Sequence, residues 1–277
     1  MSLFISSLNS GSNGNCYYIG NEKEAILIDA GISCRETEKR MKRLELTMNK
    51  VKAIFISHEH SDHINGLRVL SKKYQLPVYI TAATQRFSNL DLERSLVKRF
   101  KAGKPVTIGN LSVIAFQKEH DAGDPHSFVI SSADVKIGVF TDIGVACHRV
   151  IHHFKQCHAA FLESNYDADM LMNGNYPYHL KKRISGGNGH LSNEQALDLF
   201  IHHRPSFMSH LILSHLSQNN NKPEIVDGLF KQYAGSMNIT VASRYKESEI
   251  FLVDGTFVAA NKVKYRKITK PKQLSLF

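Results

Sequence analysis

Apolar residues recur along the chain with two different periods. Short segments that alternate apolar and polar positions, or are apolar throughout, predict strands, and longer segments with apolar residues three or four positions apart predict helices. The sequence predicts strands at 3–8, 15–21, 24–31, 51–57, 76–81, 159–165, 210–217, 238–244 and 248–255, and hairpins at 107–120 and 126–142 with turns at 109–110 and 132–134. It predicts helices at 35–46, 64–74, 147–157, 192–203 and 222–234.

The order of these segments predicts one layered α/β domain over residues 1–260. Strands and helices are interspersed, and no repeat or linker divides them. Layers of sheet and helix bury the apolar face of each kind of element. Ser192 followed three residues later by Gln195 matches a capping box at the start of one predicted helix. From 261 to 277 the periodic pattern stops, and this Lys-rich segment is predicted to be a flexible basic tail.

Composition indicates what kind of partner the protein binds and in which cellular compartment it works. The formal net charge of +10 favours an anionic partner such as nucleic acid, although a basic protein that is merely soluble has the same charge. The four cysteines form no CxxC pair, and the first ten residues lack the basic and long apolar regions of a secretory signal. We therefore expect reduced thiols, a cytoplasmic protein and no membrane segment.

The motif HEHSDH is the most specific chemical signal in the sequence. It places His58, His60, Asp62 and His63 within six residues, directly after a predicted strand. Alternating residues of an extended loop can face one point, and the last two residues, at the start of a helix, can face a second point nearby. Imidazole with carboxylate suits Zn²⁺, Mn²⁺ or Fe²⁺. The alternative is a solvated histidine-rich loop. Four ligand-type residues directly after an apolar strand argue against this alternative.

This motif resembles the HxHxDH motif of the metallo-β-lactamase superfamily, and the resemblance extends through most of the chain. It implies an αββα four-layer sandwich. His120, Asp142 and His215 match later metal ligands of the superfamily in order and in strand-end position. The implied ligands are His58, His60 and His120 for one ion, Asp62, His63 and His215 for the other, and Asp142 between them. Asp29 matches the buried acid that braces the metal loop.

The resemblance implies metal-dependent hydrolysis. Two divalent ions roughly 3.5–4 Å apart lower the pKa of a shared water and stabilise the oxyanion of an in-line displacement. The expected nucleophile is a hydroxide between the two ions, which are Zn or Mn with Fe as a further option, and Asp62 and Asp142 are the expected catalytic carboxylates. The fold does not fix the substrate, because the superfamily hydrolyses lactams, thioesters, lactones and phosphodiesters.

Several segments are similar to the YycJ/WalJ/VicX branch, whose members are regarded as DNA-directed 5′-to-3′ exonucleases. SGSNGNCYYI, ILIDAGIS, ESNYDADML, GHLSNEQA and SHLSQNNN carry this likeness. GHLSN also resembles a loop of tRNase Z relatives, which implies that His190 assists departure of the leaving oxygen; a plain helix cap is the alternative. The branch often has His at position 166, where this chain has Tyr166, so the role of that His is in question.

A few polar residues are candidates for substrate binding. They are Ser12, Asn13, Asn165, Lys181, Lys182 and Arg183. The first two lie in the loop SGSNGN, which is either a hairpin turn or a loop that binds phosphate. The three basic residues precede the His190 loop and form either a phosphate track or a solvated face. The chain has no large insertion between Asp142 and His215, which favours a compact DNA exonuclease over an RNA endonuclease.

The chain ends in QLSLF, which resembles the pentapeptide with which bacterial replication and repair proteins bind the β sliding clamp. The resemblance implies that Gln273 makes polar contacts and that Leu274, Leu276 and Phe277 fill an apolar pocket. Such a peptide acquires its order on binding, and the Lys- and Pro-containing stem before it suits a tether. The alternative is an apolar tail that folds onto its own domain.

The leading hypothesis is a two-metal phosphodiesterase that acts on nucleic acid. Among such enzymes, the sequence favours a DNA exonuclease that takes part in repair or replication. One alternative is a tRNase Z-like RNA nuclease. Another is a small-molecule hydrolase that opens a cyclic phosphodiester or a lactone, against which the net charge argues. A third is a DNA- or clamp-bound accessory protein with a structural metal site.

Overall fold

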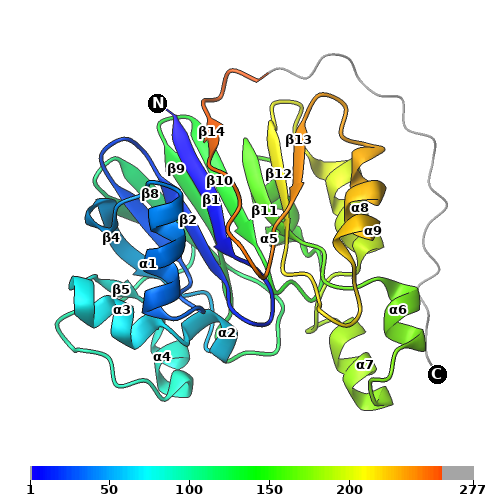
Figure 1. Ribbon diagram of the computed structural model, residues 1–277, viewed down its shortest axis with the longest axis horizontal. Helices are drawn as coiled ribbons and strands as arrows, with labels where there is room; N and C mark the ends of the chain where they lie inside the picture. Colours follow the sequence, from blue (N-terminus) through cyan, green and yellow to red (C-terminus); the bar gives the residue numbers. More distant parts are fainter. Residues whose placement is uncertain (1, 258–277) are drawn as a thin grey trace.

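Two sheets face each other at the centre of the molecule, and helices lie on their outer sides (Figure 1). The structure is a computed structural model that describes residues 2–257. Within this range the first sheet has seven strands in the order β14 (Phe251–Val253), β1 (Leu3–Asn9), β2 (Cys16–Gly20), β3 (Ala25–Ile28), β4 (Val51–Phe55), β5 (Val78–Tyr79) and β6 (Val97–Lys98).

The second sheet, within the same range, also has seven strands. Their order is β13 (Asn238–Val241), β12 (His210–Ser214), β11 (Ala159–Glu163), β10 (Val135–Phe140), β9 (His126–Ser132), β8 (Leu111–Gln117) and β7 (Pro105–Ile108). Strands β10 to β13 are parallel, as are β3 to β6 in the first sheet. Parallel strands are buried on both faces, which explains why β3 and β11 are apolar runs rather than alternating ones.

Within residues 2–257, helices lie outside the two sheets and at the edge where the strands end (Figure 1). They are α1 (Cys34–Arg43), α2 (Ser61–Ile64), α3 (Leu67–Tyr74), α4 (Ala82–Ser88), α5 (His148–Phe154), α6 (Ala168–Asn173), α7 (Tyr178–Ser185), α8 (Asn193–His203) and α9 (Pro223–Lys231), with a 3₁₀ turn η1 (Met48–Lys50). Apolar residues of α1 and α3 pack on the first sheet, and those of α5, α8 and α9 pack on the second. The predicted αββα sandwich is confirmed.

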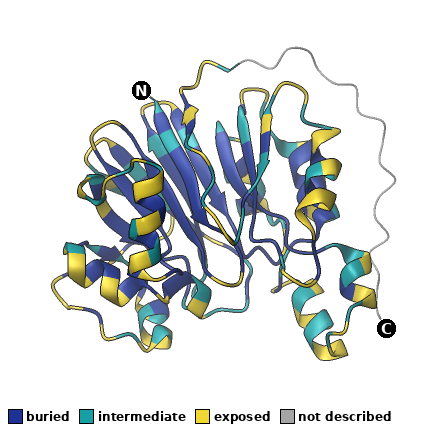
Figure 2. Ribbon diagram, viewed as in Figure 1, coloured by how far each residue is buried: buried dark blue, intermediate teal, exposed yellow. Residues whose placement is uncertain are grey.

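An apolar cluster fills the space between the two sheets. Ile5, Tyr17 and Phe55 of the first sheet pack there with Phe128 and Phe161 of the second. Figure 2 shows the same division, with buried strands at the centre and exposed residues on the outward sides of the helices. The inner layers therefore form a rigid support for the loops at the strand ends.

The structure differs from the predicted elements in a few places. The helix predicted at 64–74 is interrupted: α2 ends at Ile64 and α3 begins at Leu67. Between them Gly66 donates its N–H to Ala30 O, and a Cβ on Gly66 would lie 1.9 Å from Ile32 O. A tertiary contact that only glycine tolerates thus replaces the continuous helix.

Helices α4, α6 and α7 and strand β6 were not predicted. Two of these helices nevertheless have N-cap residues of the usual kind: Thr81 accepts from Thr84 N, and Asp167 accepts from Met170 N. The predicted capping box of α8, between Ser192 and Gln195, is confirmed.

The last two sequence predictions concern the C-terminal tail and membrane-spanning helices. The tail at 261–277, with its QLSLF ending, lies outside the described residues, so the boundary at residue 260 stays a prediction. Among the helices between residues 2 and 257, none combines the length and the apolar character that crossing a membrane requires.

Candidate metal centre

Three predicted site residues have left-handed backbone conformations at strand ends. The φ angles are 61° at Asp29, 54° at Asp142 and 56° at His215. This conformation costs a residue with a Cβ about 1–2 kcal/mol, and it makes the chain turn sharply as it leaves the sheet. Surrounding contacts hold it: Asp29 donates its N–H to Phe55 O, and His215 donates its N–H to Ser10 Oγ, each at 2.8 Å. The turns direct these side chains to one edge of the sandwich.

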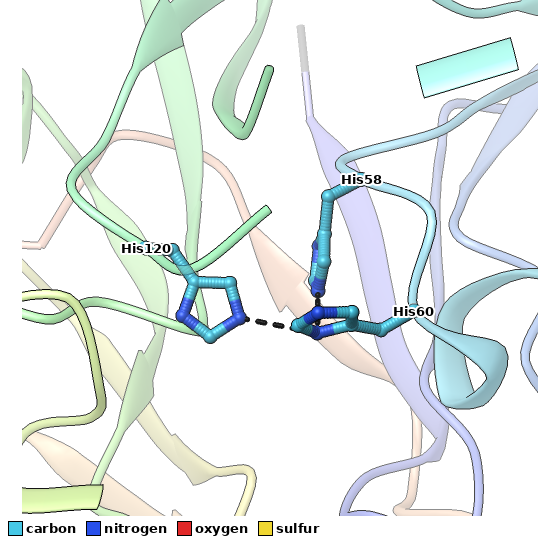
Figure 3. A group of neighbouring side chains, drawn as sticks. All are labelled: His58, His60 and His120. Carbon is cyan, nitrogen blue, oxygen red and sulfur yellow. Dashed lines mark hydrogen bonds between the residues drawn. The ribbon is translucent and has the colours of Figure 1, made fainter. Parts of the chain in front are cut away.

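Three histidines form the first group of donors. His58 and His60 come from the loop after β4, and His120 comes from the loop after β8 (Figure 3). The distance from His60 Nδ1 is 3.0 Å to His58 Nε2 and 3.3 Å to His120 Nε2. One ring nitrogen from each residue lies within 4.8 Å of the others, so a single ion can meet all three.

A second group lies beside the first. Asp62 and His63 come from α2, and His215 follows β12. The distance from Asp62 Oδ2 is 3.5 Å to His63 Nε2 and 3.3 Å to His215 Nε2. These two histidines are buried, and Asp62 is half-buried. The group therefore offers one carboxylate and two imidazoles to a second ion.

Asp142 lies between the two groups. Its carboxylate oxygens are 3.2 Å from His63 Nε2, 3.5 Å from His215 Nε2 and 3.8 Å from His120 Nε2. Oδ2 is fully buried and has no hydrogen-bond partner among the described residues. A buried acceptor without a hydrogen bond requires an explanation, and a cation bound at this position supplies one. The seven predicted ligands are thus brought together, and they fit a pair of divalent ions.

The electrostatics of the cluster support the same assignment. Burial lowers the pKa of His58 well below its usual value and that of His120 to about 4, so both rings are neutral and ready to bind a metal. Burial also acts on His63, but the carboxylates of Asp142, Asp29 and Asp62 outweigh it and raise the pKa well above its usual value. Without an ion, a protonated imidazole supplies the positive charge that these buried carboxylates require.

Asp29 lies behind the second group. Its Oδ2 accepts hydrogen bonds from His63 Nδ1 at 2.7 Å and from Ser57 Oγ at 2.8 Å, and its Oδ1 accepts from Ser57 N at 2.8 Å. Asn15 Nδ2 lies 3.1 Å from both Asp62 Oδ2 and His63 Nε2. A carboxylate bonded to the outer nitrogen of a ligating histidine fixes the ring and its tautomer.

Glu163 is a functional candidate that the sequence reasoning missed. It ends β11 and is completely buried. Oε1 lies 2.7 Å from His190 Nδ1 and 3.1 Å from His215 Nδ1, and Oε2 accepts from the backbone N–H groups of Ile143 and Leu191. Burial opposes its ionisation, but His190 and His215 outweigh burial and lower the pKa of Glu163 to about 2. One ionised carboxylate therefore orients two histidines of the site.

A second unpredicted residue is Lys118, which is buried beside Asp142. Lys118 Nζ donates to Thr141 O at 2.7 Å and lies 3.9 Å from Asp142 Oδ2. Burial lowers its pKa below the usual value. It adds positive charge at the base of the site, and its place in the sequence, two residues before His120, was the only signal for it.

Four of the seven donors, His60, Asp62, Asp142 and His215, line a pocket of about 350 Å³. Its lining includes Ser12, Asn165, Arg183, His190 and His215. Asn165 Nδ2 donates to His215 O at 2.8 Å, so this candidate substrate residue also holds a ligand loop in place. Arg183 Nε lies 2.5 Å from Asp121 Oδ2. These residues place a mixture of positive charge and hydrogen-bonding groups around the donors.

Four other predicted positions lie away from the pocket lining. Lys181 Nζ donates to Met172 O, and Lys182 is exposed on α7. Asn13 Nδ2 donates to Arg244 O at 2.8 Å. Tyr166 is buried beside the start of α8, where its backbone carbonyl accepts from Asn193 N.

The loop from Ser10 to Asn15 uses most of its backbone N–H groups within the protein. Ser10 N donates to Ser243 O, Gly14 N to Gly11 O and Asn15 N to Asp62 O. Gly11 N donates to Asn15 Oδ1. A contribution of this loop to phosphate binding would therefore depend on the exposed residues Ser12 and Asn13.

Comparison with known proteins assigns the class. A family model described as the beta-lactamase superfamily domain matches residues 24–215. The chain belongs to the metallo-β-lactamase superfamily. A solved metallo-β-lactamase fold protein, YhfI of Bacillus subtilis, superimposes with a TM-score of 0.70 at 17% identity, covering 91% of this chain and 99% of that one. At this identity the likeness concerns the fold.

Two curated relatives define the family more closely. The chain is 37% identical over 230 residues to exodeoxyribonuclease YycJ of Bacillus anthracis, covering 81% of this chain and 86% of the relative. It is 32% identical over 225 residues to exodeoxyribonuclease WalJ of Streptococcus pneumoniae, covering 79% and 84%. The chain therefore belongs to the family of these two proteins, the branch that its motifs predict.

Proposed function

We propose that this protein is a metal-dependent DNA exonuclease that degrades DNA from the 5′ end. The observation that carries the proposal is the convergence of seven metal-type donors, four of which line one open pocket, with a buried carboxylate oxygen of Asp142 that has no hydrogen bond within residues 2–257. The net charge of +10 supports a polyanionic substrate. The names of the two relatives support DNA as that polyanion.

Two divalent ions fit the donors. We propose Zn²⁺ or Mn²⁺, because both ions bind imidazole nitrogen and carboxylate oxygen. His58, His60 and His120 would hold one, Asp62, His63 and His215 the other, and Asp142 would contact both. When bound, such a pair activates a water and stabilises charge that develops on a phosphate.

His190 is the residue that we propose for proton transfer to the leaving oxygen. It is partly exposed and lines the pocket, and Glu163 fixes its Nδ1 at 2.7 Å. No hydrogen-bond partner of Nε2 is found between residues 2 and 257, so this atom remains available to a substrate. A fixed imidazole beside a reacting phosphodiester is suited to general acid catalysis.

Residues at the rim are proposed to hold the phosphates next to the cleaved bond. Arg183, Ser12 and Asn165 line the pocket and offer one guanidinium, one hydroxyl and one amide. Asn13, Lys181 and Lys182 stand farther out and would act on the strand beyond the pocket. An exposed cation contributes mainly salt-dependent affinity, so these residues are expected to affect binding more than turnover.

The proposal is tested with the purified protein and one DNA sequence labelled at either end, with and without a 5′ phosphate, in Zn²⁺, Mn²⁺ and Mg²⁺. We expect metal-dependent release of nucleotides from the 5′ end and a loss of at least about a hundredfold in Asp142→Asn. The matched control is Asp91→Asn, because Asp91 is fully exposed and remote from the pocket lining. No release from either DNA end with any of the metals would contradict the proposal.

The same experiment separates the alternatives. RNA of the same sequence, degraded faster than DNA, would favour the tRNase Z-like RNA nuclease. A cyclic phosphodiester or a lactone turned over faster than either polymer would favour the small-molecule hydrolase. Release from the 3′ end would keep the nuclease and reverse its direction.

We also propose that the tail residues Gln273, Leu274, Leu276 and Phe277 bind the β sliding clamp. They lie outside the described residues, and the support is their sequence pattern alone. Clamp binding would place the nuclease at sites of replication or repair, in the cytoplasm. The cysteines of the described chain are free, as in a reducing compartment.

A further inference from the structure

A second groove adjoins the metal pocket where β12 and β13 end, at the edge of the second sheet. It has a volume of about 480 Å³ and shares Ser217 with the pocket. The loop that carries Ser10 and Ser12 contributes to both hollows. Ser10 lines the groove, and Ser12 lines the pocket. A polymer that occupies the pocket can therefore extend into the groove without leaving the surface.

The outer wall of the groove carries an aromatic ring on a fixed backbone. Tyr245 is 74% exposed, the largest exposed fraction of any large apolar side chain between residues 2 and 257. Its carbonyl oxygen accepts from Arg40 Nη2 at 3.1 Å, and its N–H donates to Ser243 Oγ at 3.0 Å. Arg40 is itself buried and is bonded to Leu8 O and Glu36. An exposed aromatic ring on a tethered backbone is suited to stacking against a planar ligand.

The residues on either side of Tyr245 in the sequence, Arg244 and Lys246, are cationic and also line the groove. Arg244 Nη2 donates to Ser12 Oγ at 2.9 Å and Nη1 donates to Gln218 Oε1 at 2.7 Å, so its guanidinium spans the boundary between pocket and groove. Both of these partners are neutral. Within residues 2–257 no carboxylate forms an ion pair with Arg244 or Lys246. Their charges are therefore available to an anion.

The segment that carries these residues joins β13 to β14 and is well connected to the metal-site loops. In Figure 1 it runs down to the edge of the sandwich at which the site lies. Ser10 N donates to Ser243 O, and Asn13 Nδ2 donates to Arg244 O. The segment therefore has a fixed position relative to the Ser10–Asn15 loop and, through His215 N and Ser10 Oγ, to the metal ligands.

We propose that this groove is a binding track for single-stranded DNA, in which a base stacks on Tyr245 and the adjoining phosphates meet Arg244 and Lys246. The inference rests on the proposed nuclease function and adds to it the place of the strand beyond the cleaved bond. Stacking on an aromatic ring beside unpaired cations is how proteins hold single strands without reading their sequence. The one carboxylate in the lining, Glu224, stands on α9, so the phosphates follow the side formed by Arg244 and Lys246.

The test measures binding by the metal-free protein in EDTA, so it does not depend on catalysis. The probe is a fluorescein-labelled oligo(dT) of twelve nucleotides, followed by fluorescence anisotropy. We expect Tyr245→Ala to weaken binding between about fivefold and a hundredfold, and Tyr245→Phe to bind within twofold of the wild type, because a phenyl ring still stacks. Lys246→Gln should reduce the slope of log K against log salt by about 0.7.

Matched controls replace similar residues elsewhere on the surface. Phe207→Ala removes a partly exposed ring, and Lys155→Gln removes an exposed charge beside α5. Both should bind within twofold of the wild type. Unchanged binding by Tyr245→Ala, or an equal loss in Phe207→Ala, would overturn the track. Circular dichroism and the unfolding midpoint of each variant identify a loss that comes from misfolding, in which case Tyr245→Phe and Lys246→Gln decide.

Failure of the track and failure of the nuclease are separated by one parallel assay. The metal-loaded wild type is incubated with end-labelled DNA. If it degrades DNA while Tyr245→Ala binds normally, the track is overturned and the nuclease stands. If the wild type degrades no DNA, the proposed function falls, and the binding of oligo(dT) by Tyr245→Ala alone decides the track.

Discussion

Replacing Glu163 with glutamine keeps the shape of the side chain and removes its charge and one acceptor oxygen. In the native protein Oε1 faces two imidazole nitrogens, and Oε2 accepts from the N–H groups of Ile143 and Leu191. An amide placed here points an NH₂ group at one of these two sets of donors. Whichever way the amide turns, hydrogen bonds to an ionised carboxylate are lost on one side.

Two related estimates give the magnitude of the loss. Hydrogen bonds to a charged group contribute about 1.5–3 kcal/mol each, and one side of Glu163 makes two of them. A pKa lowered from 4.5 to about 2 corresponds to roughly 3 kcal/mol of favourable interaction with the ionised form. We therefore expect the free energy of unfolding of the metal-free protein to fall by about 3 kcal/mol.

The catalytic consequence is separate from stability. Glu163 is buried and touches no solvent, so it acts by positioning His190 and His215 rather than by meeting substrate. Loss of an outer partner of ligating or catalytic residues lowers metal affinity or activity by about 10- to 100-fold. We expect kcat to fall within this range in Glu163→Gln and KM to change by less than about threefold.

The assay combines urea unfolding of the metal-free protein, zinc affinity by chelator competition, and steady-state kinetics on a short single strand. Glu22→Gln is the matched control, because Glu22 is exposed in the turn between β2 and β3. A Glu163→Gln variant with the wild-type unfolding midpoint, zinc affinity and kcat would refute the role assigned to Glu163. A large rise in KM with kcat unchanged would instead place this carboxylate in substrate binding.

Three further predictions concern other parts of the molecule. Asp29→Asn removes the negative charge behind His63 and should weaken metal binding about 10- to 100-fold in chelator competition; unchanged affinity would contradict the bracing role. Deletion of residues 273–277 should abolish clamp binding in surface plasmon resonance and leave turnover of short oligonucleotides intact, and a truncated protein that binds the clamp as before would exclude the tail. Hydrogen bonds from Lys73 and Tyr74 lower the pKa of Glu38 to about 2, so its stabilising contribution is present above pH 4.5 and is lost as the pH falls toward 2. The difference in urea midpoint between the wild type and Glu38→Gln should therefore disappear over that range, and a difference that persists at pH 2 would refute this origin.

The sequence was most informative where a functional residue follows an apolar strand. Asp142 and His215 are isolated in the sequence, yet each stands just beyond a buried strand of the second sheet. Parallel strands of one sheet bring their carboxyl ends to the same edge, so such residues converge although they are far apart in the chain. These strand-end positions, together with the resemblance to the metallo-β-lactamase superfamily, identified the candidate ligands in the sequence.

Glu163 also stands at the end of an apolar strand, but it was not among the predicted site residues. It closes the apolar strand β11, between the strands that lead to Asp142 and His215. A charged residue at the inner end of a buried strand needs a partner, because burying an unpaired carboxylate is costly. A carboxylate at the end of a buried strand beside Asp142 and His215 is therefore a site candidate from the sequence, and Glu163 meets this condition.

Other features depend on tertiary contacts that no local pattern records. The break at Gly66 arises from its close approach to Ala30 and Ile32. Helices α6 and α7 are short and mostly exposed, so they lack a strong apolar periodicity. The groove at Tyr245 exists because a segment after β13 is bonded to a loop near the start of the chain.

The central claim is that two divalent ions bound by the seven donors enable the protein to degrade DNA. The most direct measurement is a titration of the metal-free protein with Mn²⁺ or Zn²⁺, following bound metal and release of nucleotides from 5′-labelled DNA in the same samples. We predict that release rises with bound metal and levels off at two ions per chain, and that Asp142→Asn releases almost none at any loading. Full activity with the metal removed, or undiminished release by Asp142→Asn, would contradict the claim.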